Sequence, residues 1–138
     1  NITYWENLPY VGIGPAAASY LDGVRRTAAA DVGAYIEAVC SGSDPPGDAE
    51  QLTGPQRLGE ALMLGLRMTQ GVDRTAFKVT YGRDPAEAFP RTVARYAASG
   101  HLAVEPERLR LAETAYFVAD TILADILAEG RRNSPPRT

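Results

Sequence analysis

From residue 53 onward, hydrophobic positions recur at the three- and four-residue spacing of amphipathic helices. The first such segment opens with Thr53-Gly54-Pro55-Gln56, where Gln stands three residues after Thr, as in a capping box, and Pro lies in the first turn. The positions that then recur are Leu58, Ala61, Leu62, Gly65, Leu66 and Thr69. Because Gly71 is typical of a helix end, the pattern predicts a helix over residues 54–70.

Capping residues predict two further helices. Asp73 can cap a short one, and Asp84-Pro85-Ala86-Glu87 can start another that Gly100 closes. Their apolar positions are Ala76, Phe77 and Val79 in the first and Ala86, Phe89, Val93 and Tyr96 in the second. Pro90 is expected to kink the second helix, predicted over 84–99, or to delay its start.

A hairpin and a last helix complete this part of the chain. Two short extended runs, 102–104 and 109–111, are joined by Glu105-Pro106-Glu107-Arg108, which predicts a β-hairpin. The last helix is predicted from Tyr116, Ala119, Ile122, Leu123, Ile126 and Leu127. Three helices, a hairpin and a final helix are the order of a winged-helix domain. We therefore predict an α+β fold, mostly helical, with a winged-helix-like domain over 50–130 and a disordered tail over 131–138.

The first 43 residues have a different pattern, and we predict that they form a separate module. Residues 1–20 contain strand-forming aromatic and β-branched residues and are predicted to be extended, with Pro9 at an edge or entry point. Asp31 can cap a short helix over 32–40. Residues 41–48 are dense in Ser, Gly, Asp and Pro, which predicts a linker and a module boundary there.

Residues 10–20, YVGIGPAAASY, interleave two glycines with apolar residues and continue into small ones. Gly12 to Ala17 match the form G-x-G-x-x-A of a dinucleotide-binding loop. We reject that interpretation, because Asp22-Gly23 breaks the chain where a long helix should run and Pro15 lacks an N–H for a phosphate. Two interpretations stay open: a tight turn that only glycine fits, or a strand end whose backbone contacts a ligand.

Composition and charge narrow the class of partner. The 138 residues carry a net charge of -3, and Lys78 is the only lysine. Winged helices often bind DNA, but the candidate helix 84–99 sets Asp84 and Glu87 against Arg91 and Arg95. We therefore expect no nucleic acid partner and interpret the hairpin domain as a lid or docking domain.

The chain shows no sequence signal for a membrane or for export. No apolar run approaches 18 residues and no signal peptide is visible, so we predict no membrane span and a cytoplasmic location. The chain also begins without Met, which we interpret as a cut through a longer polypeptide.

Two motifs resemble a known family. The pattern Y-W-x-N-x-x-Y-x-G-x-G-P-x-A-x-S is formed by Tyr4, Trp5, Asn7, Tyr10, Gly12, Gly14, Pro15, Ala17 and Ser19. It resembles the end of the radical-SAM (β/α) barrel in the HemN/HemW family, the oxygen-independent coproporphyrinogen III oxidases and related heme chaperones. A second pattern is similar to the family's L-x-L-G-L-R-x-x-x-G-V-D and is formed by Leu62, Leu64, Gly65, Leu66, Arg67, Gly71, Val72 and Asp73. The resemblance covers nearly the whole chain.

The resemblance implies a longer parent protein. Family members carry C-x-x-x-C-x-x-C in an N-terminal barrel, where three thiolates hold a [4Fe–4S] cluster that leaves one iron open for S-adenosylmethionine (SAM). This chain has one cysteine, Cys40, so we expect it to bind neither by itself and to be inactive alone. Residues 1–43 are then the barrel's end, with an edge strand, and a connecting helix.

The resemblance also suggests site residues. Gly12, Gly14 and Ala18 are expected on the SAM side of the barrel, although Ala18 stands where many chaperone-type members have His. Arg67 could contact a substrate propionate, because Arg pairs with carboxylates, but we prefer an ion pair with Asp73.

Two further side chains are candidates for a functional role. His101, the only histidine, could ligate heme, but we prefer a solvated residue at the start of the hairpin. Cys40 is expected to be a small buried apolar residue.

The implied function is oxidative decarboxylation of coproporphyrinogen III to protoporphyrinogen IX by the parent, with porphyrinogen or heme and the chain's own barrel as partners. The alternatives are a HemW-type heme chaperone and, from another class, an acidic winged-helix interaction or DNA-binding module. The sequence leaves oxidase and chaperone open, because both share the matched features.

Overall fold

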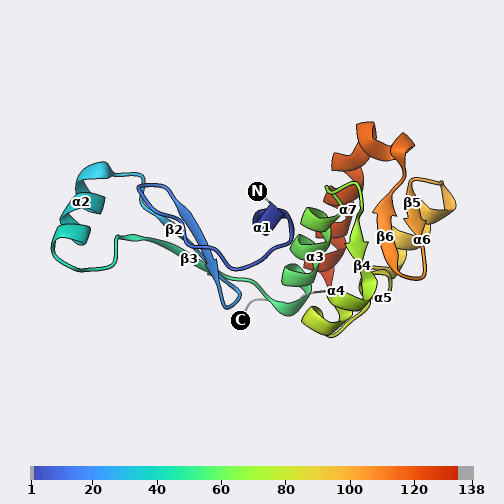
Figure 1. Ribbon diagram of the computed structural model, residues 1–138, viewed down its shortest axis with the longest axis horizontal. Coiled ribbons are helices and arrows are strands. Elements are labelled where there is room, and N and C mark those ends of the chain that lie inside the picture. Colours follow the sequence, from blue (N-terminus) through green and yellow to red (C-terminus); the bar gives the residue numbers. More distant parts are fainter. Residues whose placement is uncertain (1, 134–138) are drawn as a thin grey trace. The chain divides into compact units, whose positions relative to one another are not determined.

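The computed structural model describes residues 2–133, and its contacts divide the chain into two compact units (Figure 1). The small unit is Leu8–Leu52. The large unit joins the N-terminal residues through Asn7 to the chain from Thr53 onward. The sequence pattern predicts a different division. It assigns residues 1–7 to the first module and the boundary between the two modules to residues 43–50.

The large unit is built from helices and a small sheet. Its elements are α1 (Ile2–Trp5), α3 (Gly54–Gly65), β4 (Val72–Asp73), α4 (Arg74–Tyr81), α5 (Pro85–Ala88), α6 (Pro90–Ala98), β5 (Leu102–Val104), β6 (Arg108–Leu111), the 3-10 helix η1 (Glu113–Val118) and α7 (Ala119–Arg132). The sheet is antiparallel in the order β4-β6-β5. The predicted hairpin is therefore present, whereas β4 was not predicted. Assignment to the winged-helix class stays a prediction.

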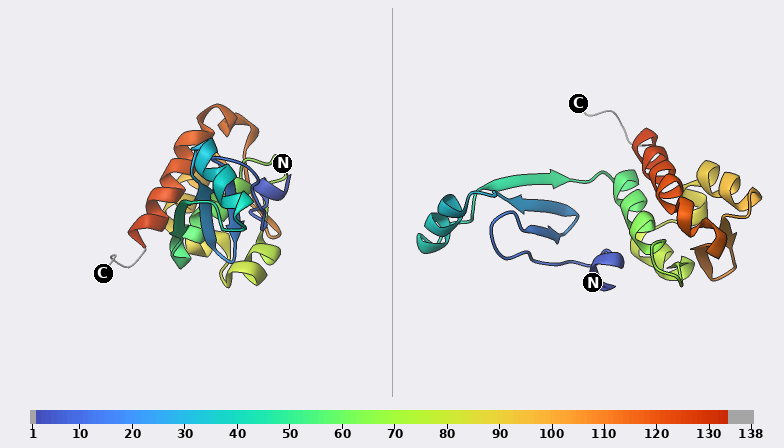
Figure 2. Two further views of the ribbon diagram at one scale, coloured as in Figure 1. Left: turned by 90° about the vertical axis from the view of Figure 1, so that its left-hand side faces the viewer. Right: turned by 90° about the horizontal axis from the view of Figure 1, so that it is seen from above.

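The core of the large unit lies between α3, α7, α6 and the hairpin. Helices α3 and α7 lie side by side in both sets of views (Figures 1 and 2). Large apolar side chains that are almost completely buried include those of Leu62, Leu66, Phe89, Leu109, Ile122 and Ile126. Each is an apolar position of the predicted pattern, and burying one such side chain contributes about 1.5–3 kcal/mol.

The single helix predicted over 84–99 is wrong, because the structure has two helices there, α5 and α6. The chain leaves helical geometry at Phe89, which has φ -129° and ψ 58°, and α6 starts at Pro90. Pro fits the first turn of a helix because it needs no N–H partner there. The delayed start was one of the two outcomes predicted for Pro90.

Two predicted helix ends also shift. Helix α3 stops at Gly65 and not at residue 70, because the next residues form successive turns toward Gly71. Helix α7 continues through Arg132, so the tail predicted for 131–138 is wrong for Arg131 and Arg132. Residues 134–138 lie outside the described residues. No helix within residues 2–133 is long and apolar enough to cross a membrane.

The N-terminal residues are helical where an extended chain was predicted. Helix α1 lies against α3, and Asn7, with φ 53°, ends that segment. The Asn7 Nδ2 donates to the Tyr81 hydroxyl at 3.3 Å. Tertiary contacts with the large unit thus override the strand propensity of Tyr4 and Trp5.

The small unit is an antiparallel sheet with one helix. Its elements are β1 (Ala18–Leu21), β2 (Val24–Ala28), α2 (Val32–Cys40) and β3 (Gly47–Gln51), and the strand order is β1-β2-β3. Asp22 and Gly23, both at positive φ, form the tight turn between β1 and β2. Asp31 caps α2 by accepting the Ala34 N–H at 2.7 Å, as predicted. Strand β3 begins inside the predicted linker.

Candidate functional site

The glycine-rich stretch of the small unit folds back on β1. A Cβ at Gly12 would collide with the carbonyl oxygen of Ala18, so only glycine fits there. The Gly12 N–H donates to the Ser19 Oγ at 3.0 Å, and Tyr10 pairs with Tyr20. The group that approaches the Gly12 backbone closely is therefore the chain's own strand.

Glycine is required at position 14 by the backbone conformation and not by a neighbouring atom. Its φ is 112°, and an added Cβ would meet nothing within 4 Å. Its N–H donates to the Tyr35 hydroxyl of α2 at 3.0 Å. The Gly14 carbonyl oxygen in turn accepts the Ala17 N–H at 3.2 Å, so both polar backbone groups of Gly14 are bonded inside the unit.

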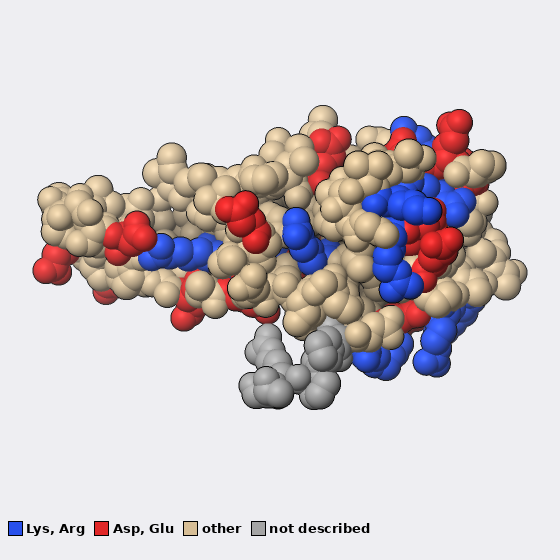
Figure 3. Space-filling view, turned by 90° about the horizontal axis from the view of Figure 1, so that it is seen from below, with Lys and Arg blue, Asp and Glu red and all other residues tan. Residues whose placement is uncertain are grey.

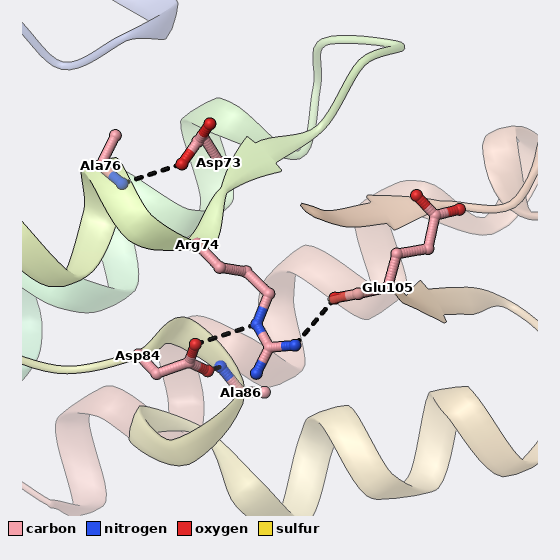
Figure 4. Close-up of polar contacts among 6 residues, drawn as sticks. All are labelled: Asp73, Arg74, Ala76, Asp84, Ala86 and Glu105. Atoms are coloured by element: carbon pink, nitrogen blue, oxygen red, sulfur yellow. Dashed lines mark hydrogen bonds and ion pairs between the residues drawn. The ribbon is translucent and has the colours of Figure 1, made fainter. Parts of the chain in front are cut away.

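Arg67 follows α3 and joins three segments of the large unit. Its guanidinium lies 3.2 Å from the Asp120 Oδ1 and 5.9 Å from the centre of the Trp5 ring. The preferred ion pair with Asp73 is wrong. The Asp73 carboxylate instead caps α4 by accepting the Ala76 N–H at 2.8 Å (Figure 4).

A partly buried ion pair that the sequence did not predict ties the helices to the hairpin. Arg74 Nε donates to Asp84 Oδ2 at 2.9 Å, and its Nη1 donates to the Glu105 carbonyl oxygen at 2.8 Å (Figure 4). Burial alone would raise the pKa of the Asp84 carboxyl. The hydrogen bond and charge of Arg74, with N–H groups of Ala86 and Glu87, instead bring this pKa below its ordinary value. The arrangement fixes the hairpin on α4 and α5.

His101 begins the hairpin and is half-buried. Its Nδ1 lies 2.7 Å from the Ser99 Oγ, and its ring meets the Tyr96 ring edge-on at 6.3 Å. The Tyr96 hydroxyl donates to the Asp125 Oδ2 at 2.7 Å, and this bond, with burial, raises the pKa of Tyr96. These contacts are those of a residue held at the end of α6.

Cys40, expected to be buried, is exposed at the end of α2. The expectation fails because α2 leaves its apolar side chains Val32, Ile36 and Val39 more than half exposed. Within residues 2–133, no three His, Cys, Asp or Glu side chains gather as a metal site.

Charges of both signs are interspersed over the large unit. On the face shown in Figure 3, basic side chains lie beside acidic ones, and no extended basic area is visible there. Two of the ion pairs are Arg95 with Asp125 at 3.1 Å and Arg110 with Glu105 at 2.8 Å.

Comparison with known proteins identifies the large unit. Residues 52–118 match the model of the HemN C-terminal domain. Over 129 residues, or 94% of the chain, the sequence is 29% identical to the heme chaperone HemW of Bacillus subtilis. The chain belongs to the HemN/HemW family. It is also 42% identical over 76 residues to the heme chaperone HemW of Synechocystis.

The fold agrees with this family. The structure is similar to that of coproporphyrinogen III oxidase (HemN) from Escherichia coli, a radical SAM enzyme, with a TM-score of 0.65 at 14% identity. That match covers 86% of this chain and 28% of the oxidase. The chain likewise spans 34% of the Bacillus subtilis relative, so it corresponds to a part of each of these longer proteins.

The second HemN/HemW motif has a structural explanation at its glycines. A Cβ at Gly65 would lie 2.5 Å from the Val72 Cγ2, so Gly65 lets α3 and β4 approach each other. Gly71 has φ 66°, and a Cβ there would collide with the Leu109 carbonyl oxygen and Arg110 of β6. The motif thus joins α3 to the sheet, and Arg67 lies in the connection between these two glycines.

Proposed function

We propose that the chain is the C-terminal segment of a radical-SAM protein that handles a tetrapyrrole, with the large unit as a lid or docking domain. The match of residues 52–118 to the HemN C-terminal domain carries this proposal. The exposed apolar residues of α2, Val32, Ile36 and Val39, fit a surface that the protein's own N-terminal barrel covers.

The first candidate activity of the parent is that of an oxygen-independent coproporphyrinogen III oxidase. The parent would remove two propionate carboxylates oxidatively to give protoporphyrinogen IX. A [4Fe–4S] cluster with bound SAM would supply the radical chemistry. The likeness of the fold to the Escherichia coli oxidase supports this candidate.

The second candidate is a heme chaperone. Three similar curated relatives are heme chaperones, including that of Lactococcus lactis at 38% identity over 72 residues. These sequence matches support the chaperone, as the likeness of the fold supports the oxidase. Both candidates bind a tetrapyrrole with propionate carboxylates, so the residues below serve either one.

We assign roles to four residues within this proposal. Gly12, Gly14 and Ala18 would line the SAM side of the barrel, where the absence of large side chains leaves room for the cofactor. Arg67 would bind a propionate carboxylate, because one guanidinium can donate two parallel N–H bonds to it.

The test is the parent reading frame and its product. If C-x-x-x-C-x-x-C is encoded upstream of Asn1, the parent is purified without oxygen, its cluster is reconstituted, and it is given SAM and coproporphyrinogen III. Formation of protoporphyrinogen IX would establish the oxidase. Stable heme binding with transfer to an acceptor, and no such product, would establish the chaperone. A frame without the cysteine motif would overturn the proposal.

A further inference from the structure

The 3-10 helix η1 presents an apolar surface to solvent. Phe117 is 100% exposed, and its neighbours Tyr116 and Val118 are each 44% exposed. Sequence analysis placed Tyr116 on the apolar side of the last helix, but the helix that buries its residues starts only at Ala119. A fully exposed phenylalanine between two exposed apolar residues marks an interaction site.

This surface adjoins the guanidinium of Arg67. Segment η1 runs directly into α7 (Figure 1). Asp120, the partner of Arg67, stands three residues after Phe117 in the sequence. Side chains three residues apart in such a helical segment are neighbours. An exposed aromatic ring and a cationic group therefore lie on the same part of the large unit.

The pairing of Arg67 leaves it able to bind another carboxylate. A single Arg67 nitrogen contacts a single Asp120 oxygen at 3.2 Å, and the Asp120 side chain is 91% exposed. Exposed pairs of this kind contribute little stability. The remaining N–H groups of a guanidinium can serve a ligand. An incoming carboxylate can thus share Arg67 with Asp120 or displace it at little cost.

We propose that Phe117 and Arg67 form a contact surface for a tetrapyrrole that carries carboxylate side chains. The macrocycle lies on the Phe117 ring, and one propionate carboxylate takes the place of Asp120 on Arg67. This inference rests on the proposed function and adds Phe117 and Asp120 to it. Charge complementarity and the adjacent exposed ring favour this ligand, since a planar macrocycle stacks on an aromatic face.

The experiment titrates the chain with coproporphyrin III and follows the fluorescence of Trp5, the only tryptophan. Replacing Phe117 by Leu keeps an apolar side chain but removes the ring, and should weaken binding about fivefold, the effect of one aromatic pair. Replacing it by Tyr should restore the affinity. The matched control is Val79→Ala, an apolar residue of α4 that is 81% exposed and should leave the affinity unchanged.

Replacing Asp120 by Asn removes the competing carboxylate and should tighten binding, by up to about fivefold for an exposed pair. Because Phe117 and Asp120 are exposed, none of these variants should unfold the chain, and circular dichroism checks this. If Asp120→Asn instead weakens the binding of coproporphyrin III, a propionate does not displace Asp120 from Arg67.

The outcomes separate this inference from the proposed function. If Arg67→Gln weakens binding and Phe117→Leu does not, the propionate role stands and the contact surface is overturned. If coproporphyrin III does not bind the unaltered chain, both the propionate role of Arg67 and the contact surface are overturned. If the chain dimerises in sedimentation and Phe117→Leu abolishes the dimer without affecting porphyrin, the surface belongs to a second copy.

Discussion

At the residue scale, the contact between Arg74 and Asp84 fixes two helices and the hairpin relative to one another. The Asp84 side chain is 11% exposed and that of Arg74 is 23% exposed, so water screens the pair poorly. We expect Asp84→Ala to lower the free energy of unfolding by about 2 kcal/mol, because it leaves the partly buried Arg74 with the Glu105 carbonyl oxygen but without a countercharge. Urea denaturation at pH 7 measures this loss. The control is Asp120→Asn, which breaks an exposed ion pair. If Asp84→Ala loses less unfolding free energy than Asp120→Asn, the expectation is contradicted.

The same residue predicts a dependence of stability on pH. Because the folded pKa of Asp84 is below its ordinary value of 3.8, its contribution is complete above that pH. It is lost as the pH falls below 3.8 and through the lower folded pKa. Denaturation of the unaltered chain and of Asp84→Asn across this interval should therefore give stability curves that converge in acid. Parallel curves would show that Asp84 does not titrate with folding.

Gly71 is a second position at which the identity of one residue affects stability. It combines φ 66° with a position where an added Cβ would collide with β6, so Gly71→Ala faces both backbone strain and a collision. We expect a loss of more than about 1 kcal/mol in unfolding free energy. Gly54→Ala is the control, because nothing lies within 4 Å of an added Cβ there. Equal thermal midpoints for the two variants would refute the argument.

At the element scale, α6 depends on a cap from another helix. Phe89, which precedes it, has no side chain that can accept the first N–H groups. Glu129 of α7, 2% exposed, accepts the Thr92 N–H at 2.9 Å and the Arg91 N–H at 3.3 Å. The carboxylate therefore joins two helices that are distant in sequence.

Removing this cap should destabilise α6. We expect Glu129→Ala to cost about 2 kcal/mol or more in unfolding free energy, since it removes charge-assisted hydrogen bonds from a buried position. Glu129→Gln keeps one acceptor oxygen and should lose less. The readout is chemical denaturation combined with amide exchange over 90–98. Unchanged exchange in Glu129→Ala would mean that the helix start is satisfied in another way.

Local signals explain which elements were predicted correctly. Asp31, Asp73 and Asp84 each accept an N–H two or three residues ahead, and Gln56 accepts the Thr53 N–H at 3.0 Å. Such caps involve neighbours in sequence and can be recognised without a fold. Helix α1 and strand β4 lack such signals, because α3 and β6 create the contacts that define them.

At the scale of the whole molecule, the two units differ in how much they bury. The large unit has one continuous apolar core, whereas the hydrophobic residues buried in the small unit are Tyr20 and Leu52. Because protection from hydrogen exchange follows buried contacts, the small unit should open more readily.

We expect amides of residues 8–14 to exchange much faster than those of Leu62 to Leu66. Hydrogen–deuterium exchange of a dilute monomer, followed by mass spectrometry, measures both segments in one sample. Full protection of residues 8–14 would contradict this expectation. The same peptides in the longer parent are the control, because a barrel that covers the small unit should slow their exchange.

The sequence by itself determined the starts of α2, α3, α4 and α5, together with the hairpin and the apolar core of the large unit, because caps, turns and periodicity act between residues close in the chain. The tertiary structure alone decided the partners of Arg67 and Glu129. Arg67 pairs with Asp120 across 53 positions, and Glu129 caps Thr92 across 37. Many carboxylates could satisfy each donor, and only the packing of α3, α6 and α7 selects one.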